Sequence, residues 1–164
     1  MRIYLFLFLF FVTIFFLLLF LPSKREIISI TKNSSSHLLD ELEKVDKDCF
    51  DKYAWKKDKF FEPKRRLIIE GIIVDNNLRA YIAYASENKN HIHIHRLAVC
   101  PEWRREGLAK FLIKNALKSY NTCSLRVNAT NEAAIQLYKS LGFKIKRKEL
   151  NFYEENEHAF FMIN

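Results

Sequence analysis

The sequence predicts an α/β domain, with a mixed sheet and helices on both faces, over residues 23–164, preceded by a hydrophobic segment over residues 1–22. Short runs in which apolar and polar residues alternate indicate strands, and stretches with apolar residues at helical spacing indicate helices. A strand-rich first half is followed by the order strand, helix, strand, helix, strand, strand. This order places helices on both faces of one mixed sheet. We find no internal repeat and no second domain in the sequence.

Each element follows from a local pattern. Residues 26–31 have strand composition, and the serines after them offer an N-cap for a helix over residues 37–45. Residues 46–63 are less regular, and the apolar runs at 67–74 and 78–85, joined by Asp-Asn-Asn, predict a hairpin. The later elements expected are a strand over His91–Val99, a helix over 105–120, a strand over 124–128, a helix over 132–141, and strands over 143–148 and 158–163.

Composition bounds the function. The 27 basic residues exceed the 19 acidic ones, which gives a formal charge of +8, and the chain is 49% hydrophobic and 28% charged. These values exclude a disordered tail. The positive charge suits a phosphorylated cofactor, nucleic acid or a membrane surface, and does not choose among them. The odd cysteine count, without a C-x-x-C pair, argues against a disulfide framework or a zinc module and favours a reducing compartment: Cys49, Cys100 and Cys123.

The N-terminal segment reads as a membrane anchor. Residues 3–21 hold Thr13 as the only clearly polar residue, and as a helix they would span roughly 28 Å, close to the thickness of a bilayer core. The end of the segment lacks the small residues of a signal-peptide cleavage site, which favours an uncleaved helix, although a signal peptide or a mis-called start codon stays open. Lys24, Arg25 and Lys32 after the segment favour a single-pass protein with a cytoplasmic C-terminal domain.

Two sequence blocks carry the chemistry. In residues 97–109 a strand runs through a basic loop into a helix, and free N–H groups at that helix start, with Gly107 and two arginines alongside, would suit a pyrophosphate. A solvated basic surface is the plainer interpretation of this block alone. Residues 131–143 predict an amphipathic helix that ends at Gly142. Only three glycines occur in the chain, and two of them fall in these blocks.

Together the two blocks resemble the GNAT family of N-acetyltransferases, most closely its ribosomal-protein alanine N-acetyltransferase branch. The first block, Arg104-x-x-Gly107-x-Ala109, is similar to the family's acyl-CoA pyrophosphate signature. The other matching stretches are Asn131-x-x-Ala134-x-x-Leu137-Tyr138-x-x-x-Gly142-Phe143, Phe152-Tyr153 and Glu157-His158-Ala159-x-x-Met162. The resemblance is strong over residues 91–163, extends less closely over 26–90 and does not cover the hydrophobic segment.

The resemblance implies a mostly antiparallel mixed sheet in which two strands splay apart around the pantetheine arm of acetyl-CoA. It implies direct attack by an amine, without an acyl-enzyme and without a metal, and main-chain donors that polarise the thioester. Tyr138 matches the general acid that protonates the departing thiolate, although a core aromatic would fit the same spacing. Asn131 matches a residue near the thioester and is also a simple N-cap. The residues implied to bind the cofactor are Leu97, Ala98, Val99, Arg104, Arg105, Glu106, Gly107, Leu108, Ala109, Asn131, Ala134 and Tyr138.

The residue at the position of the general base differs from that of the ribosomal-protein alanine N-acetyltransferase branch. Arg126 stands where the branch carries a glutamate, and arginine stays protonated. Either the base lies elsewhere, or the domain binds the cofactor without this activity. His91, His93 and His95 share one strand face, and we hypothesise His93 or His95 as the replacement base. Half-exposed histidines without a role are the plainer interpretation, and a zinc site lacks an obvious acidic or thiol partner.

Partner surfaces are less defined. Glutamates in the loop expected between the last two strands would attract a cationic acceptor, or would only be solvated: Glu149, Glu154, Glu155 and Glu157. A basic cluster near Trp55, Phe60 and Phe61 favours anionic lipid, with nucleic acid less favoured: Lys56, Lys57, Lys59, Lys64, Arg65 and Arg66. The leading prediction is a membrane-anchored N-acetyltransferase that acts on a protein N-terminus, a lysine or a small amine. The alternatives are a catalytically weak CoA-binding module and a membrane-tethered basic interaction protein.

Overall fold

A seven-stranded mixed sheet forms the centre of the part of the chain that the structure, a computed structural model, describes, residues 25–164. The predicted anchor over residues 1–22 lies outside this part. The sheet order is β1-β2-β3-β4-β5-β7-β6, and every neighbouring pair is antiparallel except β4 and β5. The strands are β1 (Glu26–Ser29), β2 (Ile68–Val74), β3 (Asn77–Asn88), β4 (His91–Val99), β5 (Thr122–Asn128), β6 (Lys144–Glu154) and β7 (Glu157–Ile163).

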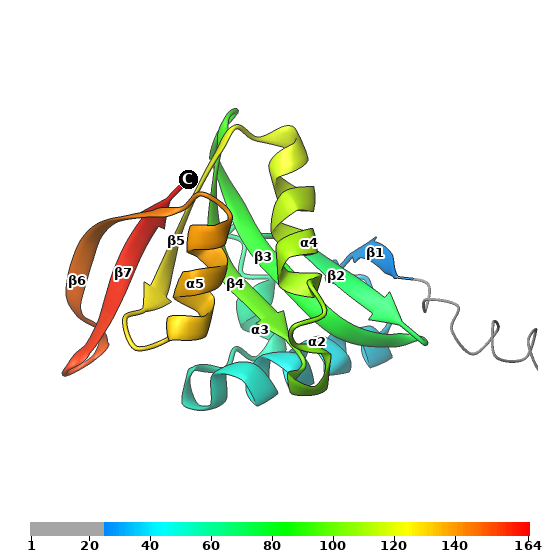
Figure 1. Ribbon diagram of the computed structural model, residues 1–164. Coiled ribbons are helices and arrows are strands. Elements are labelled where there is room, and N and C mark those ends of the chain that lie inside the picture. The colour runs from blue at the N-terminus through cyan, green and yellow to red at the C-terminus, as the bar shows by residue number, and fades with distance from the viewer. Residues whose placement is uncertain (1–24) are drawn as a thin grey trace, which may run out of the picture.

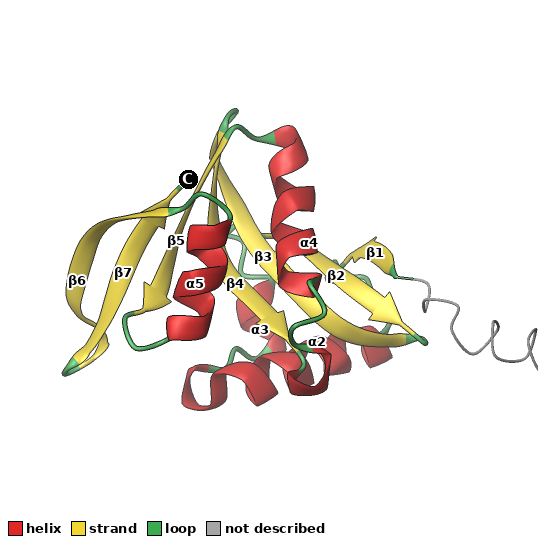
Figure 2. Ribbon diagram, viewed as in Figure 1, coloured by secondary structure: helices red, strands yellow, loops and turns green. Residues whose placement is uncertain are grey.

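Helices cover both faces of the sheet, as the sequence predicts (Figures 1 and 2). One face carries α4 and α5, and the other carries α2 and α3. The helical elements are α2 (Ser36–Phe50), η1 (Asp51–Tyr53), α3 (Lys57–Phe60), η2 (Pro101–Trp103), α4 (Leu108–Ala116), η3 (Leu117–Ser119) and α5 (Glu132–Ser140). None of the helices within residues 25–164 is long and apolar enough to cross a membrane.

The core consists of two apolar clusters separated by the sheet. Alternating side chains of β3 supply both, since Ile82 packs in the cluster under α4 and α5 while Tyr81 packs in the cluster under α2 and α3. Trp55 and Phe60 are also buried in the second cluster. These two aromatic side chains are therefore core residues. They are not part of the charged surface that the predicted basic cluster forms.

Two local signals place the first elements where the sequence predicts them. The Ser35 hydroxyl caps α2 by accepting a hydrogen bond from the Leu38 N–H at 3.2 Å. Asp75 and Asn76 both adopt left-handed backbone conformations, with φ of 50° and 62°, and join β2 to β3 in a tight hairpin. Two left-handed residues in a two-residue turn match the twist of the flanking strands, and Asp and Asn tolerate that conformation.

The bounds of two helices differ from the prediction. The helix expected over residues 37–45 continues to Phe50, because Asp46 points into the core and is fully buried there. The helix expected over 105–120 begins only at Leu108, because Arg105 and Gly107 are left-handed, with φ of 70° and 78°. It ends at Ala116 and tightens into η3.

The end of the chain also differs. The predicted loop over residues 149–157 is wrong: β6 runs to Glu154, and β7 starts at Glu157. β6 is one of the two edge strands of the sheet, and almost all of its side chains are exposed. In its second half Leu150 and Phe152 alternate with polar residues, but both are exposed and the ladder is irregular between Glu149 and Glu154, so this alternation does not mark a half-buried strand.

A buried ion pair ties α2 to the sheet and to the segment after it. The carboxylate of Asp46 lies 3.7 Å from Nε of Arg96, and it accepts hydrogen bonds from the Tyr81 hydroxyl and the Trp55 main-chain N–H. The guanidinium of Arg96 donates to the Tyr53 carbonyl and packs over the rings of Phe50 and Trp55. The polar atoms of this pair are thereby satisfied inside the core.

Replacing Asp46 with asparagine is expected to lower the free energy of unfolding by about 2 kcal/mol. The neutral amide no longer balances the buried guanidinium of Arg96. Urea unfolding measures the loss, and Asp48→Asn, at an exposed position of the same helix, is the matched control. Equal stability of the two variants would show that the buried charge is not needed.

Candidate active site

The two central parallel strands separate halfway along their length. β4 and β5 pair only from His91 opposite Thr122 to Ile94 opposite Leu125. Beyond this point β4 still pairs with β3, up to Val99, but no longer with β5. A bulge in the β3–β4 ladder coincides with the separation and inserts His95 as an extra residue. Main-chain groups on the β5 side of β4 are thus left without a strand partner, as the resemblance implies.

The start of α4 offers main-chain donors beside this opening. Gly107 is the N-cap, and its backbone is left-handed (φ 78°, ψ 5°). The first N–H to bond back is that of Phe111, to the Gly107 carbonyl at 2.9 Å, so the helix itself does not use the N–H groups of residues 108–110. A Cβ on Gly107 would meet no atom within 4 Å, so the loop surface is open to a ligand here. Such a helix start suits an anion such as a phosphate.

The charged residues of the loop do not converge on that helix start. The Arg104 guanidinium folds back onto β4, where its Nε donates to the Val99 carbonyl at 3.2 Å. Glu106 pairs with Arg25, whose Nη2 lies 3.4 Å from the carboxylate. Arg105 is exposed. Direct contact of Arg104 with a pyrophosphate would need its side chain to turn.

α5 places a tyrosine on the face of the sheet that α4 also covers. Asn131 caps this helix by accepting a hydrogen bond from the Ala134 N–H at 3.1 Å. Tyr138 is buried in the core cluster, with its ring centroid 5.7 Å from that of Phe143. Burial raises the pKa of the Tyr138 phenol well above its ordinary value. The phenol is therefore protonated at neutral pH, the state that a general acid needs.

On the opposite face, the two strands present a histidine to a serine. His93 is buried, and its Nδ1 lies 2.8 Å from Oγ of Ser124, the residue opposite it in the register. Burial, followed by the charge of Arg126, lowers the pKa of His93 to about 4. His95 stands next to it, with a ring-centroid separation of 4.9 Å. The His93 imidazole is therefore neutral at pH 7 and able to accept a proton.

Arg126 has a partner that sequence reasoning missed. Its guanidinium forms two hydrogen bonds with Glu149, at 2.6 Å from Nε and 3.4 Å from Nη2. The hydrogen bond from Arg126 lowers the pKa of Glu149, and Arg147 also bonds the same carboxylate. Glu149 lies on β6 rather than in a loop, and its side chain reaches Arg126 across the intervening strand β7. A carboxylate is thus present near the position where the branch carries its glutamate, but two arginines hold it.

As the pH falls from 7 to 5, the buried imidazole of His93 is expected to lower the free energy of unfolding. Its folded pKa is about 4 and that of an unfolded histidine is near 6.5, so only the unfolded chain binds a proton in this range. The free energy of unfolding therefore falls as the pH falls, by about 2 kcal/mol for this group. Urea unfolding at the two pH values measures the slope. His93→Gln should reduce the slope by this amount, whereas His37→Gln, at an exposed histidine, should not.

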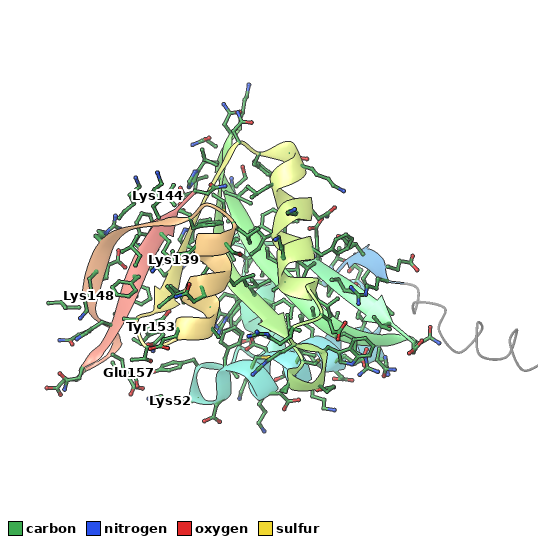
Figure 3. The ribbon with its side chains drawn as sticks, in the orientation of Figure 1. Lys52, Lys139, Lys144, Lys148, Tyr153 and Glu157 are labelled. Atoms are coloured by element: carbon green, nitrogen blue, oxygen red, sulfur yellow. The ribbon has the colours of Figure 1, made fainter. Side chains whose placement is uncertain are left out.

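The segment after α2 reaches across to the β6–β7 hairpin. Lys52 Nζ lies 2.6 Å from Glu154 and 3.0 Å from Glu157, and the Tyr53 hydroxyl donates to Glu157 at 2.8 Å. Figure 3 shows Lys52 and Glu157 together with Tyr153, which packs against the Tyr53 ring at 5.6 Å. Of the four predicted acceptor-facing glutamates, three are thus paired and Glu155 is exposed.

A metal site is not indicated in the described part of the chain. Within residues 25–164, no group of three or more His, Cys, Asp or Glu side chains is placed to hold a metal ion. The three cysteines are free thiols, and burial raises the pKa of each. None of the three is therefore a thiolate poised to act as a nucleophile at neutral pH.

Comparison with known proteins identifies the family of the chain, and this family agrees with the fold and with the opening between β4 and β5. The chain matches the acetyltransferase (GNAT) family over residues 33–143, and it belongs to that family. Membership confirms the predicted acetyltransferase class and acetyl-CoA, the cosubstrate of GNAT acetyltransferases. The predicted fold class is confirmed as well.

Individual relatives are similar over part of their length. The chain is 38% identical to the mouse Cysteine-rich protein 2-binding protein over 86 residues, which are 44% of the chain and 10% of that protein. It is 32% identical over 105 residues to the N-terminal acetyltransferase B complex catalytic subunit naa20 of Schizosaccharomyces pombe, 59% of the chain and 58% of the relative. The chain thus spans about a tenth and about three fifths of these relatives.

A solved structure shows the same fold. The ribosomal-protein-S18-alanine N-acetyltransferase from Escherichia coli superposes with a TM-score of 0.73 at 22% identity, covering 85% of this chain and 92% of that one. The mixed sheet and its helices are therefore shared with this enzyme.

Proposed function

We propose that the chain transfers the acetyl group of acetyl-CoA to a primary amine, and that the amine is the N-terminus of a peptide or protein. The observation that carries the proposal is the separation of β4 from β5, which leaves unpaired main-chain groups between the start of α4 and Tyr138. The names of the relatives, an N-terminal acetyltransferase subunit and a ribosomal-protein alanine N-acetyltransferase, support an α-amino acceptor.

The binding roles follow from the geometry. The free N–H groups at the start of α4 would bind the pyrophosphate of acetyl-CoA, and the open edge of β4 near Leu97 and Val99 would bind the pantetheine amides. Main-chain donors at this edge would stabilise the negative charge that develops on the thioester oxygen. Arg104 now occupies the Val99 carbonyl, so we expect its side chain to move when the cosubstrate binds.

The chemistry needs one base and one acid. The amine nitrogen attacks the carbonyl carbon, and the bond from that carbon to sulfur breaks as the amide forms. Tyr138 gives a proton to the departing thiolate, and the phenol is restored from the amine or from solvent. We assign the base to His93, which is neutral and lies at the point where the strands separate. Glu149 is a weaker candidate because Arg126 and Arg147 both neutralise it.

The test is transfer to defined acceptors. The full chain is incubated with acetyl-CoA and one of three probes. The first is a lysine-free peptide with a free N-terminus, the second is that peptide acetylated at its N-terminus and with one lysine added, and the third is spermidine. We expect CoA thiol release above the level without acceptor for the first probe, with mass spectrometry locating the acetyl group. Acetylation of the lysine peptide or of spermidine alone would replace the acceptor class. No release with any probe would contradict the activity.

We also propose that residues 3–21 anchor the chain in a membrane, with residues 23–164 on the cytoplasmic side. The apolar length and the basic residues that follow it support this orientation. The lysines and arginines of residues 56–66 would then contact anionic headgroups through charge. We expect the full chain to resist alkaline extraction from membranes and Val12→Arg with Phe16→Arg to release it. A Val12→Leu, Phe16→Leu variant is the control, and extraction of the unaltered chain would contradict the anchor.

A further inference from the structure

Polar side chains on β4 and β5 form a continuous hydrogen-bonded chain beside the separation of the two strands. Arg126 Nη1 lies 3.4 Å from His93 Nε2, and His93 Nδ1 lies 2.8 Å from Ser124 Oγ. The same serine oxygen lies 2.9 Å from His91 Nε2, and His91 Nδ1 lies 2.7 Å from Thr122 Oγ1. The proposed transfer uses only the first histidine of this chain, so Ser124 and His91 have no role in it.

The guanidinium of Arg126 fixes the direction of the chain. Arginine can only donate, so His93 Nε2 must accept, and the neutral imidazole carries its proton on Nδ1. That N–H donates to Ser124, whose single hydroxyl proton is then left for His91 Nε2. An acceptor ammonium presents the same kind of donor as the guanidinium and would take its place at His93 Nε2.

The direction continues to the surface. Because His91 accepts at Nε2, its Nδ1 donates to Thr122, and the threonine hydroxyl donates to the Asn90 carbonyl at 3.3 Å. All the side-chain hydrogen bonds along the path point the same way, and the Asn90 carbonyl at its end also accepts from the N–H groups of Asn121 and Thr122.

The surrounding charges favour a proton at the His91 end. The carboxylate of Glu87 lies 3.4 Å from His91 Nε2, while Arg126 and the ring of His95 face His93, with Glu149 beyond the guanidinium. A carboxylate stabilises an imidazolium, and a guanidinium opposes one. The side chain of His91 is also 17% exposed, whereas that of Ser124 is buried.

We propose that Ser124 and His91 relay to solvent the proton that His93 takes from the acceptor ammonium, an inference that rests on the proposed function. The ammonium gives a proton to His93 Nε2, His93 Nδ1 gives its proton to Ser124 Oγ, and the serine hydroxyl proton moves to His91 Nε2. His91, now an imidazolium beside Glu87, releases the proton to water. After the amide leaves, His93 gives its Nε2 proton to water and regains a proton at Nδ1 from Ser124, whose hydroxyl turns back and is reprotonated from water through His91.

Ser124 is the residue to replace, because it is not the base. In the full chain we expect Ser124→Ala to lower kcat for the peptide with a free N-terminus by about 10-fold or more, with little change in KM for acetyl-CoA. Ser124→Thr, which keeps the hydroxyl, should restore kcat. Small buffer bases such as imidazole should raise kcat of Ser124→Ala in proportion to their concentration and leave that of the unaltered chain unchanged, because they remove the trapped proton.

These readouts separate the relay from the function on which it rests. Absence of turnover by the unaltered chain would overturn the function and the relay together. Turnover by Ser124→Ala equal to that of the unaltered chain, or a loss that neither threonine nor buffer restores, would overturn the relay alone. Ser86→Ala, at an exposed serine of β3 outside the hydrogen-bonded chain, is the matched control.

The tautomers give a readout that does not depend on activity. In the full chain labelled with ¹⁵N-histidine, long-range ¹H–¹⁵N correlations at pH 7 should show His91 and His93 as Nδ1–H forms. Ser124→Ala removes the acceptor of the His93 proton and should change the His93 pattern. A His93 Nε2–H form in the unaltered chain would contradict the direction of the relay.

Discussion

Replacing Tyr138 with phenylalanine is expected to lower kcat by about 1,000-fold and to leave KM for acetyl-CoA within a few-fold of its original value. The phenol acts only when the thiolate departs, so its loss raises the barrier of the chemical step and not the energy of binding. The ring of the phenylalanine keeps the packing against Phe143 and the core. Thiol release with the peptide probe measures the rate.

Stability separates this effect from damage to the core. Urea unfolding of Tyr138→Phe should match that of the unaltered chain within about 1 kcal/mol, because the substitution removes one hydroxyl and no apolar surface. Tyr120→Phe, at a partly buried tyrosine that packs on Tyr84, is the matched control for the loss of a phenol. A Tyr138→Phe variant with unaltered kcat would make this residue a core aromatic only.

Replacing Gly107 with glutamate is expected to weaken acetyl-CoA binding by about 100-fold or more, measured by calorimetric titration of the full chain. The new carboxylate would stand at the helix start, where the N–H groups of residues 108–110 are free for a pyrophosphate. Two charge-assisted hydrogen bonds lost there account for a change of this size.

Gly142→Glu is a close match for this variant. Gly142 is also exposed and left-handed, with φ of 88°, and a Cβ there would likewise meet no atom within 4 Å. Both substitutions therefore introduce the same charge and a similar backbone strain, but only one lies at the start of α4. Undiminished acetyl-CoA binding by both variants would show that the pyrophosphate does not bind at Gly107. Loss of binding in both would indicate a general effect of backbone strain.

The sequence predicts an element well where packing or turn chemistry leaves a local signal. β4 begins and ends at the predicted residues because its isoleucines alternate with polar residues and Pro101 follows it closely. In the second half of β6 the alternation of Leu150 and Phe152 with polar residues is misleading, since both side chains are exposed and the ladder is irregular there. Asp46 also misleads the prediction of the helix end. An aspartate normally indicates an exposed position, but this carboxylate is buried against Arg96.

For the site, local features are predictable and contacts between strands are not. Asn131 predicts the start of α5, because an amide cap is a local requirement, whereas Gly107 falls inside the helix expected from residue 105 and proves to be its left-handed N-cap. The contact of His93 with Ser124 depends on the register between β4 and β5, which the spacing within either strand does not contain. The pairing of Arg126 with Glu149 depends further on β6 lying beyond β7.

The exposed edge of the sheet bears on how the molecule behaves among copies of itself. β6 has a free side along which another strand could pair, and Ile145, Leu150 and Phe152 are exposed on it. Lysines at 144, 146 and 148 stand among these apolar groups, with Lys144 and Lys148 visible in Figure 3. A second β6 approaching this edge would bring lysines against lysines and strip water from their ammonium groups. The first half of the strand thus guards the domain against edge-to-edge aggregation while its second half supplies Glu149 to the site.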